Sequence, residues 1–278
     1  MFSYLATVRY SECDDGGRLG WGSLMNLFQD ASAFQSEHLG VGLDFLAEQK
    51  RGWVVNFWDV FVNEFPKMGE EVVVSTIPYE IGGFFGKRNF TMRKAPEQAS
   101  RGDTEAIRFP STDLNATDYR AIHDGQSFAY ANSLWTFIDM ETFHPARVTE
   151  PWLSAYEVSE KVPMEYGNRK ITVPEELSPL SPVTIRPHHL DTNHHMNNAQ
   201  YILIALDAIE EHKEELEKSE KSTAKLLSEK KIRRLRAEYR KGVYLGDTLY
   251  PKIYMDQEKA LISLQDLENK PYAVIEFT

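Results

Sequence analysis

A polar loop that runs directly into an apolar stretch decides the fold of this chain. The sequence there is Asp191-Thr192-Asn193-His194-His195-Met196-Asn197-Asn198, followed by Ala199-Gln200-Tyr201-Ile202-Leu203-Ile204-Ala205-Leu206. Asp191, Asn193 and His195 recur at every second position. Because alternate residues of an extended segment point to one side, we expect these three side chains to face one pocket. Unpaired backbone N–H groups at the start of the following helix would stabilise developing negative charge there.

The same pattern occurs near the N-terminus. A shift of 177 residues aligns the two regions without gaps and pairs Thr7 with Thr184, Arg9 with Arg186, Asp14 with Asp191, Asp30 with Asp207, and Ala31 with Ala208. Much further along the chain, the same shift places Gly69-Glu70 on Gly246-Asp247. Two separate matches at one shift indicate a duplication, so we expect two copies of one fold.

Each copy has the same order of predicted elements. A short strand (5–10 and 183–187) leads through the polar loop into a helix (23–39, and from about 199 onwards). Strand patterns follow at 53–62, 71–77, 84–93 and 127–138, and in the second copy at 231–239, 248–255, 260–267 and 273–277. One helix followed by an antiparallel meander, twice, predicts an α+β protein. The second helix is apolar almost all round to 208, as a buried helix would be, and then turns polar.

The predicted domain boundaries follow from composition. The N-terminal domain covers 1–149 and the C-terminal domain covers 183–278. Between them, 150–182 is rich in Pro and Glu and predicts an ordered linker. The polar stretch 94–126 predicts a long surface loop.

Composition limits the classes of protein to which the chain can belong. It has 278 residues, of which 42% are hydrophobic, and a net charge of −11, which argues against general nucleic-acid binding. No apolar run approaches the roughly 20 residues of a membrane span, and the N-terminus lacks the pattern of a secretory signal. A single cysteine, Cys13, excludes an internal disulfide. These features predict a cytoplasmic globular protein.

The quoted residues resemble the acyl-acyl-carrier-protein thioesterases of bacteria and plant plastids. The signature of that family, Asp-x-Asn-x-His-x-Asn-Asn-x-x-Tyr, is matched here by Asp191, Asn193, His195, Asn197, Asn198 and Tyr201. Further agreement lies in Arg169-Lys170-Ile171, in 14–29, and in Tyr239 followed by Gly246-Asp247. The resemblance implies a tandem double hotdog, in which each half is a long helix wrapped by an antiparallel sheet. It also implies hydrolysis of fatty acyl thioesters carried on the phosphopantetheine of acyl carrier protein, without a cofactor.

The sequence departs from the family pattern at one important position. Family members carry a catalytic glutamate three residues after the tyrosine, where this chain has Gly242, and some plant members follow it with a cysteine, where this chain has Val243. Glu238 is the nearest acid, but four residues of strand span roughly 13 Å. Water or Asp191 could fill the role, and we expect either slower turnover or a rearranged group that activates water.

The resemblance and the residue chemistry together suggest roles for three side chains. His195 is suited to act as general base, and Asn193 offers an amide N–H to the thioester carbonyl. Asp191 could orient either of them. The first copy has Gly16 and Arg18 in place of Asn193 and His195, so we expect it to lack the chemistry and to supply a wall of the acyl pocket. A capped loop without catalysis is the simpler alternative.

A metal site is a less favoured reading of the same loop. His188, His189, His194 and His195 with Asp191 could supply ligands, but the alternating asparagines are poor ligands and no cysteine joins them. The sequence therefore predicts no metal.

Two further groups of residues have open interpretations. A basic concentration either forms a solvated strand face or docks the acidic carrier protein; it comprises Lys230, Lys231, Arg233, Arg234, Arg236, Arg240 and Lys241. Arg233, Arg234 and Arg236 are the candidate carrier-binding residues, with Asn197 and Asn198 beside the substrate. Aromatic residues could line an acyl tunnel or pack in the core; these are Trp53, Phe57, Trp58, Phe61 and Phe65.

Other functions compete with acyl-carrier-protein hydrolysis. An acyl-CoA thioesterase would use the same site. A double-hotdog hydratase or dehydratase would need an Asp/His pair in another local context, which the sequence lacks. A non-catalytic acyl-thioester binder would explain Gly242, whereas the retained Asp191, Asn193 and His195 argue against it. A homodimer is left open.

Overall fold

The computed structural model describes residues 1–96, 107–108, 118–218, 227 and 232–278. Most of the predicted loop 94–126 and the first residue of the strand predicted at 231–239 lie outside these ranges. The chain forms two compact units. The first comprises Met1–Asn56 and Val60–Tyr166, and the second comprises Phe57–Asp59 and Gly167–Thr278. The predicted linker 150–182 is therefore divided between them.

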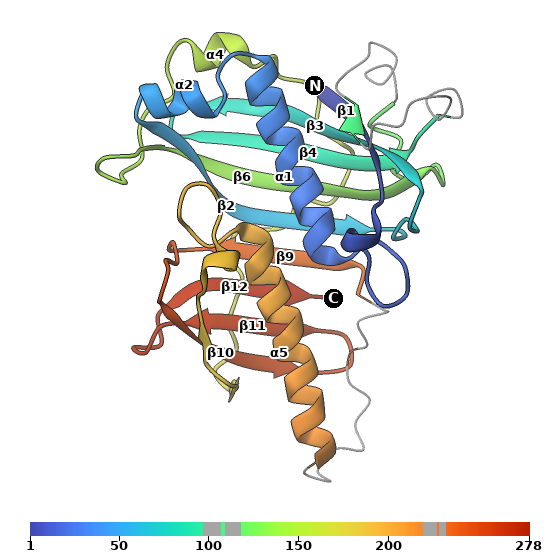
Figure 1. The fold of residues 1–278 in the computed structure, drawn as a ribbon, viewed down its shortest axis with the longest axis vertical. Coiled ribbons are helices and arrows are strands. Elements are labelled where there is room, and N and C mark those ends of the chain that lie inside the picture. Colours follow the sequence, from blue (N-terminus) through green and yellow to red (C-terminus); the bar gives the residue numbers. More distant parts are fainter. Residues whose placement is uncertain (97–106, 109–117, 219–226, 228–231) are drawn as a thin grey trace. The chain divides into compact units, whose positions relative to one another are not determined.

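The first unit is a long helix lying across an antiparallel sheet (Figure 1). The helix is α1 (Trp21–His38), and it contacts β1 (Phe2–Thr7) and β3 (Glu71–Gly82). The other strands are β2 (Arg51–Val62), β4 (Phe85–Lys94), β5 (Ile107–Arg108) and β6 (Ser127–Asp139), and the order is β5-β1-β3-β4-β6-β2. Short helical segments complete the unit: a 3-10 helix η1 (Tyr10–Glu12), α2 (Leu43–Glu48) and α4 (Trp152–Ala155).

Helical spacing of apolar residues places α1 on its sheet. Leu24, Leu27, Phe28 and Ala31 follow the i, i+3, i+4, i+7 spacing of one helix face and are all buried. The hydroxyl of Tyr4 in β1 donates to the Leu27 carbonyl at 2.9 Å and so fixes the helix against the strand. The burial of this one stripe, rather than intrinsic helix propensity, stabilises the helix.

The second unit has the same design. Helix α5 (Asn198–Lys218) packs against β10 (Thr248–Met255), β11 (Ala260–Gln265) and β12 (Pro271–Phe277). The strand order is β9-β12-β11-β10-β7, with β9 at Arg234–Tyr239 and β7 at Ser178–Pro179. Strand β8 (Val183–Thr184) also pairs with β10, and a 3-10 helix η2 (Pro187–His189) precedes the loop before α5.

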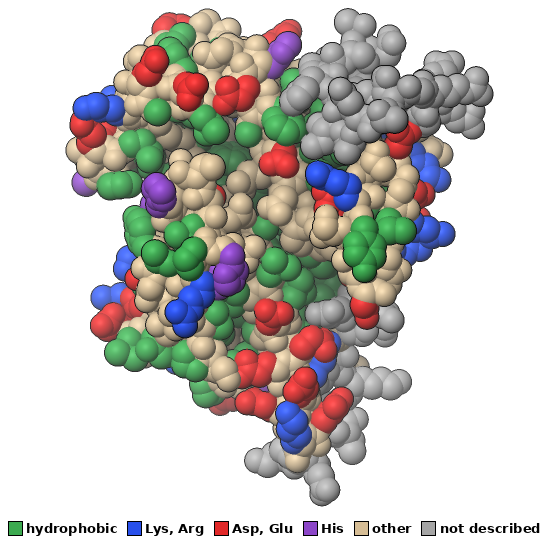
Figure 2. All heavy atoms as spheres, viewed as in Figure 1, with side chains coloured by type: hydrophobic (Ala, Val, Ile, Leu, Met, Phe, Trp, Pro, Cys, Tyr) green, Lys and Arg blue, Asp and Glu red, His purple; other side chains and the backbone are tan. Residues whose placement is uncertain are grey.

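Helix α5 is amphipathic from its start. Tyr201, Ile202, Ala205 and Ala208 are buried, whereas Leu203 is 39% exposed. The prediction of a helix buried all round to 208 is therefore wrong, because only one face of α5 meets the sheet. The predicted polar second half is confirmed: Figure 2 shows Asp and Glu side chains gathered over the end of α5.

The aromatic residues considered for an acyl tunnel pack against other rings or in the core. Phe61 stacks on Tyr130 with ring centroids 5.2 Å apart, and Trp53 packs against Phe137. Trp58 is fully buried. None of the helices in the described ranges is long and apolar enough to cross a membrane.

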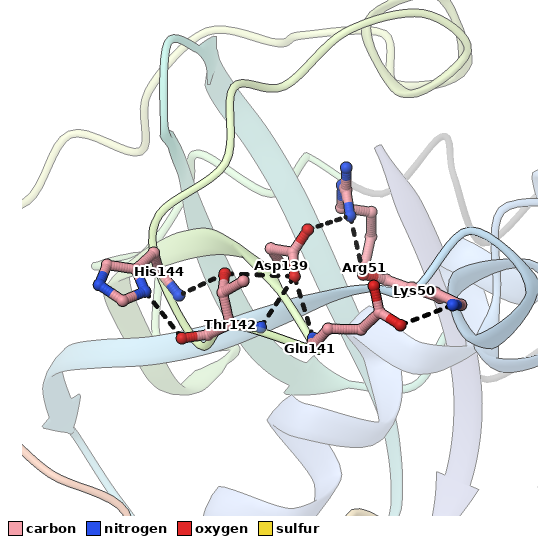
Figure 3. Close-up of polar contacts among 6 residues, drawn as sticks. All are labelled: Lys50, Arg51, Asp139, Glu141, Thr142 and His144. Carbon is pink, nitrogen blue, oxygen red and sulfur yellow. Dashed lines mark hydrogen bonds and ion pairs between the residues drawn. The ribbon is translucent and has the colours of Figure 1, made fainter.

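A polar turn closes the end of β6 (Figure 3). The Asp139 carboxylate accepts the backbone N–H groups of Thr142 and Glu141, each at 3.0 Å, and binds Arg51 at 2.7 Å. The Nδ1 atom of His144 lies 2.7 Å from the Thr142 carbonyl. The hydrogen bonds from Thr142 and Glu141 stabilise the ionised carboxylate and lower the pKa of Asp139.

Candidate active site

The segment from Asp191 to His195 forms a closed turn. The Asp191 carboxylate accepts the backbone N–H groups of Asn193 at 2.8 Å and His195 at 3.4 Å. The Asp191 N–H donates to the His195 carbonyl at 2.8 Å, and His194 has a φ of 60°. The expectation of an extended segment with alternating side chains is therefore wrong, because the carboxylate folds the backbone around itself. Asp191 organises the loop through main-chain contacts.

The first unit contains the same turn at the same shift of 177 residues. The Asp14 carboxylate accepts the backbone N–H groups of Gly16 and Arg18, each at 2.9 Å, and the Asp14 N–H donates to the Arg18 carbonyl at 2.7 Å. Gly17 has a φ of 70°, like His194 in the second unit. A non-glycine residue in this conformation costs roughly 1–2 kcal/mol, so the surrounding hydrogen bonds hold His194 there.

The predicted catalytic side chains differ in exposure. Asn193 is exposed, and its side-chain amide makes no hydrogen bond to any described residue. His195 is half-buried. The next residue, Met196, donates its N–H to the Val243 carbonyl at 2.8 Å, which ties the turn to the segment after β9. The turn therefore presents an available amide and a partly enclosed imidazole.

Asn197 caps helix α5. Its side-chain oxygen accepts the Ala199 N–H at 2.8 Å, and its carbonyl accepts the Gln200 N–H at 2.9 Å. The Asn197 N–H donates to the His189 carbonyl at 2.8 Å. The N–H groups of Ala199 and Gln200 are therefore bonded already and do not provide the unpaired donors expected from the sequence. The neighbouring Asn198 accepts the Tyr239 hydroxyl at 3.1 Å through its carbonyl.

Gly242, where the resemblance leads us to expect a glutamate, lies against the imidazole of His195. A Cβ atom placed on Gly242 would be 3.3 Å from Cδ2 and 3.8 Å from Nε2 of His195. The same point lies 3.7 Å from the hydroxyl oxygen of Tyr244. The Tyr244 ring packs on the imidazole with centroids 4.7 Å apart and an interplanar angle of 58°. Tyr244 was missed in the sequence because only its placement beside His195 distinguishes it from any loop tyrosine.

Glu238 is held by other partners in the second unit. Its carboxylate accepts the backbone N–H of Ile171 at 3.0 Å and binds Arg240 at 2.9 Å. Burial favours the neutral acid, but the hydrogen bonds from Arg240 and Ile171 outweigh it and lower the pKa of Glu238. These contacts agree with the expectation that Glu238 is no substitute for the missing glutamate.

A tight turn fixes the backbone of Tyr244. The Asp247 N–H donates to the Tyr244 carbonyl at 3.1 Å, and the Asp247 carboxylate accepts the Tyr244 N–H at 2.9 Å. Gly246 has a φ of 86°, a conformation that glycine adopts readily. In the first unit, Lys67 and Glu70 make the same two hydrogen bonds, at 3.0 and 2.6 Å. The hydrogen-bond pattern that the two units share therefore includes this turn.

Most of the candidate carrier-binding arginines are engaged within the second unit. Arg234 binds both carboxylate oxygens of Asp59, at 2.9 and 3.0 Å, and Arg236 binds Glu276 at 2.7 Å. Arg233 is exposed. Their part in carrier binding stays a prediction. Lys230 and Lys231 lie outside the described residues.

Two histidines pack against each other before the turn. The rings of His188 and His189 lie 4.2 Å apart, and Nδ1 of His189 accepts the Arg186 N–H at 3.0 Å. Burial, reinforced by the charges of His188 and Arg186, lowers the pKa of His189. Within the described ranges, no group of three or more His, Cys, Asp or Glu side chains is placed to hold a metal ion.

Two solved structures with the same fold are acyl-ACP thioesterases. An acyl-ACP thioesterase from Bacteroides thetaiotaomicron matches with a TM-score of 0.73 and 22% identity over 99% of this chain and 96% of that one. A 12:0-ACP thioesterase from Umbellularia californica matches with a TM-score of 0.72 and 15% identity over 99% and 95% of the two chains. At these identities the likeness establishes the fold.

Sequence comparison identifies the family. The N-terminal domain of acyl-ACP thioesterases matches residues 2–104, and the C-terminal domain matches residues 174–270. No curated protein matched the sequence directly. The chain belongs to the acyl-ACP thioesterase family.

Proposed function

We propose that this protein hydrolyses fatty acyl thioesters of acyl carrier protein to free fatty acid and carrier thiol. One observation carries the proposal: a closed turn presents the available amide of Asn193 and the half-buried imidazole of His195, next to the position where the family has its glutamate. An imidazole titrates near neutrality and suits general-base chemistry. Membership of a thioesterase family supports this reaction class.

The proposed reaction uses His195 and Asn193 in complementary roles. His195 takes a proton from water while the water oxygen bonds to the thioester carbonyl carbon. The Asn193 side chain donates a hydrogen bond to the oxyanion that forms, because the nearby Ala199 and Gln200 amides are already bonded. The carbon–sulfur bond then breaks, and the imidazolium returns its proton to the departing sulfur. Asp191 holds the turn in shape throughout.

The first unit has the same closed turn but lacks the side chains proposed for catalysis. Gly16 has no amide side chain, and Arg18 binds Glu64 at 3.0 Å and the Phe65 carbonyl at 2.6 Å. A guanidinium stays protonated and cannot serve as a base. We therefore propose two hotdog domains, at 1–149 and 183–278 with a linker at 150–182, of which only the second is catalytic.

The test is thiol release by the purified protein from acyl carrier proteins loaded with acyl chains of different lengths. A matched panel of acyl-CoA substrates separates carrier preference from general thioesterase activity. We expect His195→Ala to lower kcat by about 10²–10⁴-fold, the usual contribution of general-base catalysis. Arg18→Ala, at the matching position of the first unit, should retain full activity. An active His195→Ala variant would refute the base assignment.

A non-catalytic acyl-thioester binder is the second candidate, and the absence of a carboxylate at Gly242 favours it. Such a protein would bind acyl carrier protein or acyl-CoA and release no thiol at any chain length. The same panel therefore separates the two proposals.

A further inference from the structure

We propose that Tyr244 positions the attacking water in the space that the family glutamate would fill. This inference rests on the proposed function and names a further catalytic residue for it. Gly242 leaves the space without a side chain, so the neighbours that border it decide what occupies it. The nearest of those neighbours are the imidazole of His195 and the hydroxyl of Tyr244.

The distances place both groups around one point. A side chain starting at Gly242 would begin 3.8 Å from Nε2 of His195 and 3.7 Å from the Tyr244 hydroxyl oxygen. That point is one bond length from the Gly242 Cα, so we place the water farther out in the same direction, beside the base and a second polar group. The heavy atom nearest to the point is the imidazole Cδ2 at 3.3 Å, which is not a hydrogen-bonding group. Nε2 and the hydroxyl are thus the two polar atoms among the three heavy atoms nearest to the point.

The chemistry differs from that of a carboxylate. A phenol hydroxyl both donates and accepts hydrogen bonds. In the proposed arrangement the water donates one hydrogen to Nε2 of His195 and the other to the Tyr244 oxygen. His195 takes the first hydrogen as a proton when the water oxygen attacks, and Tyr244 keeps its own hydroxyl proton. The tyrosine therefore orients the nucleophile, and His195 is the base.

The fold holds Tyr244 in place for this role. Its backbone is fixed at both ends of the turn by Asp247, and its ring rests on the imidazole. In the first unit the matching residues, Arg18 and Lys67, are backbone bridge partners. Two cations there correspond to an imidazole and a phenol in the second unit. The residue pair at these two positions is therefore His195 and Tyr244 in the unit with the catalytic motif, and Arg18 and Lys67 in the unit without it.

A double-mutant cycle tests the proposal. Tyr244→Phe keeps the ring on His195 and removes only the hydroxyl. We expect kcat to fall about tenfold, the value of one ordinary hydrogen bond, with KM unchanged. Gly242→Glu supplies the family carboxylate, and in that background Tyr244→Phe should change kcat by less than about twofold, because the two side chains then serve one function. Lys67→Ala, the matched variant in the first unit, should leave kcat unchanged.

A spectroscopic measurement tests the hydrogen-bonded link without turnover. The ¹⁵N resonance of His195 Nε2 should move in Tyr244→Phe relative to the unaltered protein, because the bridging water loses one partner, while the acid limb of the pH–rate profile stays in place. An unaltered protein that releases no thiol overturns the proposed function. An unchanged Nε2 resonance, or an equal loss of kcat for Tyr244→Phe with glycine and with glutamate at 242, overturns the role of Tyr244.

Discussion

Replacing Asp191 with alanine should separate the architecture of the site from its chemistry. The substitution removes the acceptor of two backbone N–H groups, at 2.8 and 3.4 Å. A carboxylate that caps backbone N–H groups in this way contributes about 1 kcal/mol, and the longer contact adds little because it is near the limit of a hydrogen bond. In a chain of this size, 1 kcal/mol lowers the midpoint of thermal unfolding by about 2–4 °C.

The effect on activity should be much larger than the effect on stability. Without the acceptor, the backbone at Asn193 and His195 relaxes, and a displacement of about 1 Å can lower a rate by about 10²-fold. Asp14→Ala removes two equivalent hydrogen bonds, at 2.9 Å each, from the turn of the first unit. It should lower the unfolding midpoint at least as much, because both of its hydrogen bonds are short, and leave thiol release unchanged.

The assay combines thermal unfolding followed by circular dichroism with thiol release from acyl carrier protein. Asp191→Asn keeps an oxygen acceptor for both N–H groups and should retain most of the activity. If Asp191→Asn is as inactive as Asp191→Ala, the charge of Asp191 acts on the reaction and the account of a backbone cap is wrong. An Asp14→Ala variant that loses activity would refute the confinement of chemistry to the second unit.

Two further predictions concern stability. Asn197→Ala should lower the free energy of unfolding by about 1 kcal/mol through loss of the α5 cap, whereas Asn197→Asp should preserve it, as measured by urea denaturation. Asp139 has a lowered pKa in the folded state, so its stabilising effect is present above its unfolded pKa of about 4 and is lost as pH falls through the folded value. Unfolding free energies measured from pH 6 to pH 2 should therefore fall less steeply in Asp139→Asn; an unchanged slope would contradict the assignment.

Hydrophobic periodicity predicted the regular elements closely. The strand expected at 248–255 is β10, and the helix expected at 23–39 is α1 at Trp21–His38. The predicted ends of elements are wrong where the buried face ends and local hydrogen bonds determine the backbone conformation. The first strand was expected to reach 10, but β1 ends at Thr7, and a 3-10 helix begins at Tyr10.

The sequence motif names the residues of the candidate site but does not predict their geometry. The motif identified Asp191, Asn193 and His195, yet alternation failed because the Asp191 carboxylate closes a turn that periodicity cannot represent. The gap at Gly242 was visible in the sequence. Its neighbour Tyr244 was not, because the contact with His195 joins two segments almost 50 residues apart, and one sequence carries no signal for such a pairing.

The matching turns also bear on how such a protein can diverge. Main-chain groups, the two aspartates and the acids Glu70 and Asp247 close the turns in both units. Positions whose residue type changes completely, such as Lys67 and Tyr244, enter these closing hydrogen bonds through their backbone atoms. After duplication of an ancestral gene, substitutions at the positions that differ could remove or change the catalytic side chains of one half while that half still folds. Divergence of this kind requires that the residues that build the turns are different from the residues that react.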